Sequence, residues 1–375
     1  MTLFSAGDNF SGGLGRRDNC SSSVTPIKGS DFTHVVSMSA YRRTFLVFDD
    51  GHVEYCGRDE NETFSDTDET EFRVFDDLKK EKIVSVSANR HFVCFTNDKG
   101  ELFVNEKGMD EDDIEKIEVL KDEKIVFVSS FNSIWAIGNS KHNGCIYKLT
   151  HDFESPPAKY VLKNPVIEVY ENLESVVAIT NEFVALGKGR VSKGSEEFVP
   201  IESLSNKRII KFAVSDSHIL CIDIEGRAYS YGENDKGQLG RGDKNDDYEN
   251  FVQIDALETR KITNISANGK FSLFITSEGD VYGCGLSSDG RTFLGSDFAH
   301  GKTSVPQLSD AIRSAGARAV EAACGERFSI VLADIPNRFR NRAAEELVKK
   351  DMLTAAGQVA DGGRQAEKSK CCLLI

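Results

Sequence analysis

The chain has 375 residues, of which 39% are hydrophobic and 28% charged, values that are typical of a soluble globular protein with one large domain or two ordinary ones. A net charge of −14 argues against a general binder of nucleic-acid phosphates and fits a partner with a basic face. No run approaches the roughly 18 continuous apolar residues of a membrane-spanning helix. The first residues carry no basic segment followed by a long apolar run, so no secretory signal is expected.

The cysteines are odd in number, nine, and their spacing does not match a metal site. We therefore expect no metal and no cofactor, and reduced thiols that serve as small apolar core groups. The cysteines in strand-like runs are Cys56, Cys94, Cys221, Cys284 and Cys324.

A hairpin unit, made of an apolar strand, a turn often ending in Gly and a second strand, recurs along the chain. Its copies cover 45–57, 91–104, 133–147, 175–187, 218–232 and 272–285, and a lone first strand follows at 328–332. Strand candidates at 83–87, 125–128, 209–212 and 262–265 precede several hairpins. Because residues 2–7 can supply the strand that the seventh copy lacks, the pattern predicts an all-β, seven-bladed β-propeller over residues 1–335. A β-sandwich would not require a period near 45 residues.

The clearest copy, residues 227–243, reads Arg-Ala-Tyr-Ser-Tyr-Gly-Glu-Asn-Asp-Lys-Gly-Gln-Leu-Gly-Arg-Gly-Asp. It resembles the repeat of the regulator of chromosome condensation family, in which a Tyr-containing strand precedes Gly-x-Asn-x-x-Gly-Gln-Leu-Gly. The resemblance covers residues 2–334, is strong in the fifth and sixth copies and weak in the third and fourth, and implies the same seven-bladed fold.

Antiparallel pairing places the residues before each first strand and those after each second strand at one face of the ring. Acidic segments at 59–71 and 109–115 fall on the same face, where each alone could be a merely solvated loop. Together with the polar loop tips they favour a partner-binding surface. The partner-binding candidates are Asp59, Glu60, Asn89, Arg90, His91, Asp110, Asp112, Ser217, Glu233 and Asn234.

The resemblance implies a function for this face, because the founding member of the family binds the small GTPase Ran and accelerates its nucleotide exchange. By position in the repeat, Asp216, His218 and Asp235 correspond to the functional loop tips and are the catalytic candidates. Ser217 and Arg90 depart from the family pattern and argue against full exchange activity. His218 could instead cap its strand. A monomer is expected, and without a basic N-terminal tail no DNA or chromatin binding is expected.

The composition changes after Asp334, where the repeat ends. Residues 336–357 have the apolar spacing of an amphipathic helix that packs on the propeller rim or lies on a membrane, and 358–375 form a flexible tail. The final Cys372-Leu-Leu-Ile matches a C-a-a-X prenylation box, and the adjacent Cys371 is a candidate for palmitoylation. These features predict a location on the cytoplasmic face of a eukaryotic membrane, for a eukaryotic protein or for a bacterial effector lipidated by its host.

Two functional hypotheses result. The first is a membrane-anchored guanine-nucleotide exchange factor for a Ran-like small GTPase. The second is a non-catalytic propeller that recruits a small GTPase or another protein to a membrane. A light sensor of the plant photoreceptor type needs clustered tryptophans, and this chain has one. The sequence shows no phosphate loop, metal cluster or nucleophile motif that would support bond-breaking chemistry.

Overall fold

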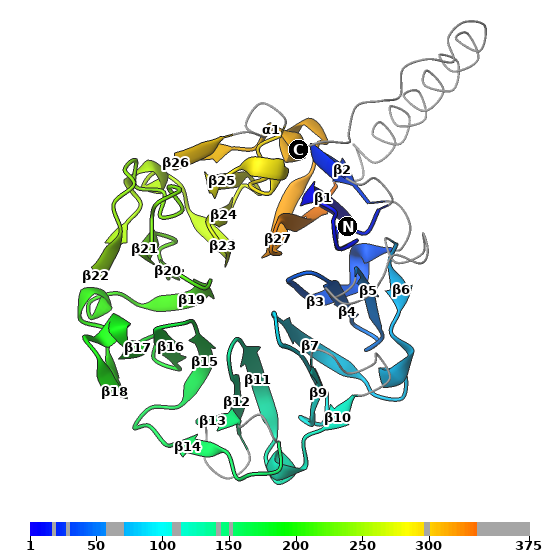
Figure 1. Cartoon of the computed structure of the whole chain (residues 1–375), viewed down its shortest axis with the longest axis vertical. Helices are drawn as coiled ribbons and strands as arrows, with labels where there is room; N and C mark the ends of the chain where they lie inside the picture. The colour runs from blue at the N-terminus through cyan, green and yellow to red at the C-terminus, as the bar shows by residue number, and fades with distance from the viewer. Residues whose placement is uncertain are drawn as a thin grey trace, which may run out of the picture.

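Seven four-stranded antiparallel sheets stand around a central axis as the blades of a propeller (Figure 1). The computed structural model describes residues 1–16, 20–27, 31–57, 71–106, 114–139, 144–149, 153–295 and 301–335. The seven-bladed fold predicted from the repeat is therefore confirmed, with four strands in every blade. The predicted C-terminal helix and tail lie outside the described residues, and among those residues no helix is long and apolar enough to cross a membrane.

Each blade runs from an inner strand at the axis to an outer strand at the rim (Figure 1). Blade 1 contains β3 (Val35–Ala40), β4 (Thr44–Phe48), β5 (Val53–Cys56) and β6 (Arg73–Val74). Blade 2 contains β7 (Ile83–Ala88), β8 (Phe92–Asn97), β9 (Leu102–Glu106) and β10 (Glu115–Lys116). Blade 3 contains β11 (Ile125–Ser130), β12 (Ile134–Gly138), β13 (Cys145–Leu149) and β14 (Ala158–Tyr160). Blade 4 contains β15 (Val166–Glu171), β16 (Ser175–Thr180), β17 (Ala185–Gly189) and β18 (Ser195–Pro200).

The remaining blades follow the same order. Blade 5 contains β19 (Ile209–Val214), β20 (His218–Asp223), β21 (Ala228–Gly232) and β22 (Asp247–Gln253). Blade 6 contains β23 (Ile262–Asn268), β24 (Phe271–Thr276), β25 (Val281–Leu286) and β26 (Lys302–Leu308). Blade 7 contains β27 (Arg318–Cys324), β28 (Phe328–Asp334), β1 (Thr2–Asp8) and β2 (Cys20–Pro26). Short helical segments lie in the connections between strands. Those that precede inner strands are the helix α1 (Asp310–Ser314) and the 3-10 turns η1 (Phe32–His34), η3 (Asp76–Leu78), η4 (Glu118–Leu120), η6 (Glu202–Leu204) and η7 (Asp255–Leu257). Two others, η5 (Arg190–Ser192) and η8 (Ser288–Gly290), follow third strands.

The second strands read as continuous apolar runs because both faces of each blade pack against a neighbouring blade. All six residues of β16, β20 and β24 are buried, whereas the outer strands β18 and β22 are largely accessible to solvent. The hydrophobic core is thus divided into layers between successive blades, with Phe212, Tyr231 and Phe251 among the side chains of one layer. Six cysteines of the blades are buried free thiols, in agreement with the expectation of reduced core cysteines: Cys56, Cys94, Cys145, Cys221, Cys284 and Cys324.

The ring closes through its N-terminal strand, as predicted. β1 pairs antiparallel with β28, in a register that runs from Thr2 opposite Ala333 to Gly7 opposite Phe328. The chain also supplies β2 as the outer strand of the same blade, which the sequence pattern had not revealed. The joint buries Phe4 in a core cluster shared by blades 6 and 7, so closure stabilises the ring through apolar burial as well as through strand pairing.

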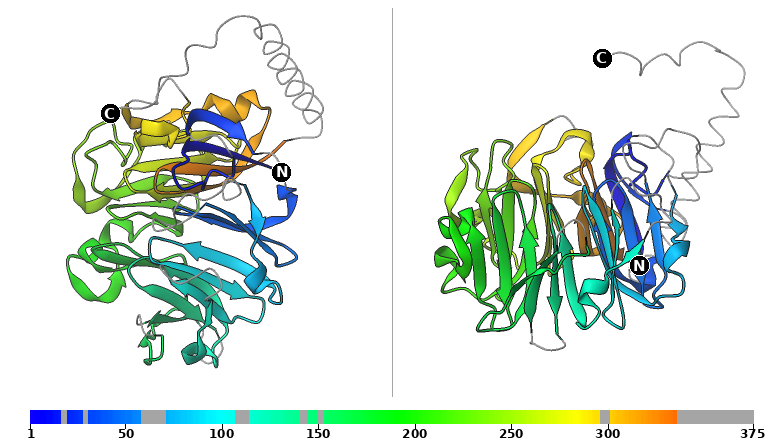
Figure 2. Two further views of the ribbon diagram at one scale, coloured as in Figure 1. Left: turned by 45° about the vertical axis from the view of Figure 1, so that its right-hand side comes forward. Right: turned by 60° about the horizontal axis from the view of Figure 1, so that its bottom comes forward.

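The inner strands surround a central channel with a volume of about 610 Å³. Polar side chains tie neighbouring inner strands together: the Ser39 hydroxyl accepts a hydrogen bond from the Ala88 amide over 2.9 Å, and the Asn268 amide donates to the Cys324 carbonyl over 3.0 Å. We call the end of the ring that carries the inner-to-second-strand loops the loop face, and the end that carries the hairpin turns between second and third strands the turn face. Figure 2 shows the blades side by side around the ring in two tilted views.

Candidate functional site

Loops from four blades bring charged and polar side chains together at the loop-face mouth of the channel. Asp216 is exposed on the loop between β19 and β20, and partial enclosure raises the pKa of its carboxyl group, with Arg90 opposing the shift and Glu326 adding to it. Burial raises the pKa of Tyr41 to about 12, and Glu326 and Asp216 add to this shift. Since Tyr41, Arg90, Asp216 and Glu326 act on one another's charge, blades 1, 2, 5 and 7 share one electrostatic environment at the mouth.

A second group of charges lies where blades 5 and 6 meet. The Lys270 ammonium lies 2.9 Å from Glu233 Oε1 and 3.0 Å from Asp235 Oδ2, and Lys236 also pairs with Asp235. Although partial burial alone would raise their pKa values, hydrogen bonds from Ser217 and Lys270 lower the pKa of Glu233, and those from Lys236 and Lys270 lower that of Asp235. Both carboxylates are therefore ionised at neutral pH, and Lys270 is a site residue that the sequence candidates did not include.

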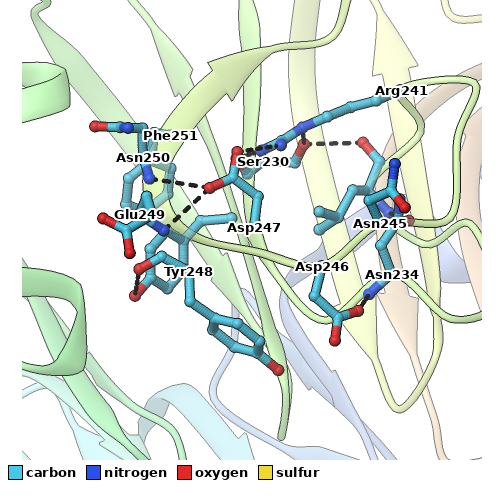
Figure 3. A network of polar contacts seen from close by, with 12 residues as sticks. Ser230, Asn234, Arg241, Asn245, Asp246, Asp247, Tyr248, Glu249, Asn250 and Phe251 are labelled. Atoms are coloured by element: carbon cyan, nitrogen blue, oxygen red, sulfur yellow. Dashed lines mark hydrogen bonds and ion pairs between the residues drawn. The ribbon is translucent and has the colours of Figure 1, made fainter.

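The loop from Gly232 to Asp247 is held by its own polar network (Figure 3). The Arg241 guanidinium donates to Asp247 Oδ2 over 2.7 Å and to Ser230 Oγ over 3.0 Å, while Asp247 Oδ1 accepts from the Glu249 and Asn250 amides. Charge-assisted hydrogen bonds of this kind hold a loop in one geometry. The carboxylates of Glu233 and Asp235, at the start of this loop, are thus held in a fixed position.

Asn234 belongs to this polar network and not to the binding surface. Its side chain is fully buried, its amide donates to Asp243 Oδ1 over 2.9 Å, and its carbonyl oxygen accepts from the Leu239 amide over 3.0 Å. The prediction that Asn234 contacts a partner is therefore corrected. In the Gly-x-Asn-x-x-Gly-Gln-Leu-Gly pattern, this asparagine closes the loop.

Gly232 sets the distance between the two loop tips of blade 5. It has a φ of 112°, and a Cβ at this position would lie 2.4 Å from the Ser217 carbonyl oxygen. The close approach lets the Glu233 amide donate to that same oxygen over 2.9 Å. Only glycine permits this contact without strain, so the glycine brings the loop of Asp216 beside the loop of Asp235.

The structure also corrects the role predicted for His218. Its side chain is completely buried, with Nδ1 2.6 Å from the Ser215 hydroxyl and Nε2 2.8 Å from the hydroxyl of Ser272 in blade 6. Burial lowers the pKa of the imidazole to about 4, so it is neutral at physiological pH. His218 therefore cannot reach a partner directly. It connects blades 5 and 6, a structural role that is closer to the alternative expectation that His218 caps its strand.

The other candidates divide between surface and scaffold. Arg90 and His91 are exposed on the loop face, and Ser217 is half-buried beside Asp216. Asn89 shapes its loop, because its side-chain oxygen accepts hydrogen bonds from the amides of His91 and Phe92. The candidates that lie outside the described residues, and remain predictions, are Asp59, Glu60, Asp110, Asp112, Cys371 and Cys372.

The described part of the chain holds no group of three His, Cys, Asp or Glu side chains placed to bind a metal ion. The site consists of ionised carboxylates, ammonium and guanidinium groups on loops that are fixed by the blades beneath them. Such an arrangement is suited to recognising a charged protein surface.

Comparison with known proteins defines the class of repeat. Two models of the regulator of chromosome condensation (RCC1) repeat match the chain, at residues 225–275 and 262–291. The chain thus carries RCC1 repeats and folds as a seven-bladed propeller.

Several curated proteins are similar to part of the chain. The ultraviolet-B receptor UVR8 of Arabidopsis thaliana is 36% identical over 118 residues, which are 30% of this chain and 26% of the receptor. The human E3 ubiquitin-protein ligase HERC2 is 30% identical over 181 residues, 45% of this chain and 4% of the ligase. The protein RCC2 homolog of Xenopus laevis is 32% identical over 117 residues, 31% of this chain and 21% of that protein. Each match thus spans about a quarter or less of the relative's own length.

Solved structures share the fold over most of the chain. Prp20p from Saccharomyces cerevisiae, reported with its binding properties to Gsp1p and histones, superposes with a TM-score of 0.73 at 15% identity, over 93% of this chain and 95% of Prp20p. Human WBSCR16 gives a TM-score of 0.74 at 14% identity, over 89% of this chain and 100% of that one. At these identities the likeness establishes the propeller fold alone.

Proposed function

We propose that this propeller binds a Ran-like small GTPase through its loop face and accelerates the exchange of its bound guanine nucleotide. The observation that carries the proposal is the convergence of Asp216, Glu233, Asp235 and Glu326 on one face, presented by loops that are fixed by internal hydrogen bonds. The likeness to Prp20p, which is reported with binding properties to Gsp1p, supports a small GTPase as the partner.

In this proposal the exchange factor breaks no bond. It binds the nucleotide-free GTPase more tightly than the nucleotide-bound form, and this difference in affinity shifts the GTPase toward the open state. The carboxylates of Asp216 and Asp235 compete with nucleotide phosphates for basic side chains of the GTPase. A fixed loop helps, because little conformational entropy is lost when a rigid surface binds.

A second candidate function is favoured by the burial of His218. Because that imidazole cannot act at the surface, fewer side chains are left to displace the nucleotide than the resemblance implied. In this alternative the propeller binds the GTPase, or another basic protein, and recruits it without changing its exchange rate.

Membrane attachment through Cys372 is the part of the proposal that stands on sequence alone. A prenyl group on Cys372, with a palmitoyl group on Cys371 as a second lipid, would concentrate the propeller at a membrane. Mass spectrometry of the protein from eukaryotic cells, and fractionation of a Cys372→Ser variant, test this separately. Equal membrane association of the Cys372→Ser variant and the parent protein would refute the lipid anchor.

The exchange activity is tested by release of fluorescent GDP from Ran and related GTPases. The full chain should accelerate release, and Asp216→Ala or Asp235→Ala should each slow the accelerated rate by about tenfold or more, consistent with the loss of a charged interaction. Asp98→Ala is the matched control, since Asp98 is an exposed aspartate in the β8–β9 turn on the opposite face. Binding without acceleration would favour the second candidate, and neither binding nor acceleration would reject both.

A further inference from the structure

Each inner strand carries one β-bulge near its start, and the bulged residue holds the same register position in all seven blades. Because the inner strands stand around the axis and start at the turn face, these positions form one ring at that end of the molecule (Figure 1). In blade 6 the position is held by Thr263, and in the other blades by β-branched aliphatic residues. These aliphatic residues, which we call the collar, are Val36, Val84, Val126, Ile167, Ile210 and Val320.

The collar is exposed although it consists of apolar side chains. Ile210 is half-buried, and the other members are between 40% and 52% exposed. By contrast, the residues directly before the bulge are packed between blades, with Ile83, Ile125 and Ile209 at most 3% exposed. A single exposed aliphatic residue is ordinary, but a ring of them at one register position makes a contiguous apolar surface, which marks a site of contact.

The chain itself leads to the collar. Strand β28 ends at the turn face, where Asp334 lies opposite Arg318, two residues before Val320 of the collar. Ile335 follows, packs against the core cluster of blades 6 and 7, and is the last described residue. An extended chain advances by about 3.3 Å per residue, so the four residues from Ile335 to Phe339 span up to about 13 Å. The segment 336–357 therefore starts within reach of the collar.

The sequence of this segment suits an apolar surface. Phe339, Ala343 and Leu347 stand at steps of four, which places them on one face of the helix expected for 336–357. Exposed side chains of both signs, such as Lys124 and Glu225, surround the collar, and the segment also carries both signs. A short tether gives a segment an effective concentration in the millimolar range, an advantage that a membrane or a second copy of the chain does not have.

We propose that residues 336–357 dock on the collar through Phe339, Ala343 and Leu347 and cover the turn-face end of the channel. Docking removes apolar surface of both the collar and the segment from water, which stabilises the contact. Of the two places expected for this segment, the propeller and a membrane, the propeller is favoured because its exposed apolar ring lies beside the start of the segment. The loop face stays free, so this inference does not depend on GTPase binding.

Limited trypsin digestion of the full chain tests the proposal. The segment contains cleavage sites at Arg342 and Lys349, and Arg364 lies beyond it as an internal standard. A docked site is cut only while it is open, so the double variant Val126→Asp/Ile167→Asp should raise cleavage at Arg342 and Lys349 by about tenfold or more and leave cleavage at Arg364 unchanged.

The matched control is Val252→Asp, because Val252 is also 41% exposed but lies on the outer strand β22. It should leave every cleavage rate unchanged. Since both replaced collar residues are at least 40% exposed, the double variant should keep the unfolding midpoint of the parent protein.

The reciprocal change completes the test. Phe339→Asp/Leu347→Asp should raise cleavage at Lys349 as much as the collar variant does, and combining the two sets should add nothing further, because both remove one contact. Equal cleavage of the parent and the collar variant overturns the proposal, as does a full sum of the two effects. Protection that grows with protein concentration assigns the collar to a second copy, and protection that appears only with phosphatidylserine vesicles assigns it to a membrane; either result also overturns the proposal.

Discussion

Acidification should destabilise this propeller through His218. The imidazole is fully buried, and its pKa falls from 6.5 to about 4 on folding, so the unfolded chain binds a proton that the folded protein excludes. The stability that depends on the neutral ring is complete above pH 6.5 and is lost as the pH falls towards 4. At about 1.4 kcal/mol per pKa unit, the loss amounts to roughly 3 kcal/mol, a large share of a typical folding free energy of about 5–15 kcal/mol.

The pH dependence of the parent protein alone would not isolate this effect. Glu168 acts in the opposite direction, because burial raises its pKa to about 7, so its contribution is lost as the pH rises. The assay therefore compares urea unfolding of the parent and of His218→Gln between pH 4 and 7.5, with the single buried tryptophan, Trp135, as the fluorescent reporter. The unfolding free energy of the parent minus that of His218→Gln should fall by about 3 kcal/mol from pH 7.5 to pH 4. A difference that stays constant across this range would refute a buried, neutral His218.

Two further predictions concern the scaffold. Gly232→Ala should destabilise the protein by about 3 kcal/mol, because it combines an unfavourable backbone conformation with a clash against the Ser217 carbonyl. Gly194→Ala is the control, since Gly194 also has a positive φ, of 83°, but no atom lies within 4 Å of the new Cβ. It should cost only about 1 kcal/mol. Thermal unfolding of both variants checks this, and equal losses would contradict it. Phe4→Ala should cost about 3–5 kcal/mol, because this 3% exposed side chain packs in the closure of the ring. A loss below 1 kcal/mol in chemical denaturation would show that closure does not depend on the N-terminal strand.

The sequence predicted the ring because its hairpins carry strong local signals. Gly226 and Gly279 end the turns of the predicted copies 218–232 and 272–285, and residues 2–7 pair in blade 7 as expected. The fourth copy, predicted over 175–187, is less regular: Phe183 occupies the turn with a φ of 65°, and β17 begins only at Ala185. A bulky residue with positive φ is uncommon, so the pattern could not indicate it.

The site was harder to predict, because exposure is set by neighbouring blades. His218 is the first residue of its strand, and a polar residue at that position suggests an exposed loop tip. Its side chain instead contacts Ser272 of the next blade, 54 residues away in the sequence.

The measurement that tests the central claim most directly is the affinity of the full chain for a nucleotide-free Ran-like GTPase after charge reversal on each face. Asp216→Lys should weaken binding by tenfold or more, about 1.4 kcal/mol, because it places a cation against a basic partner surface. Asp98→Lys, the same change on the turn face, should leave the affinity within twofold. An undiminished affinity for Asp216→Lys, or an equal loss for Asp98→Lys, would contradict a GTPase-binding loop face.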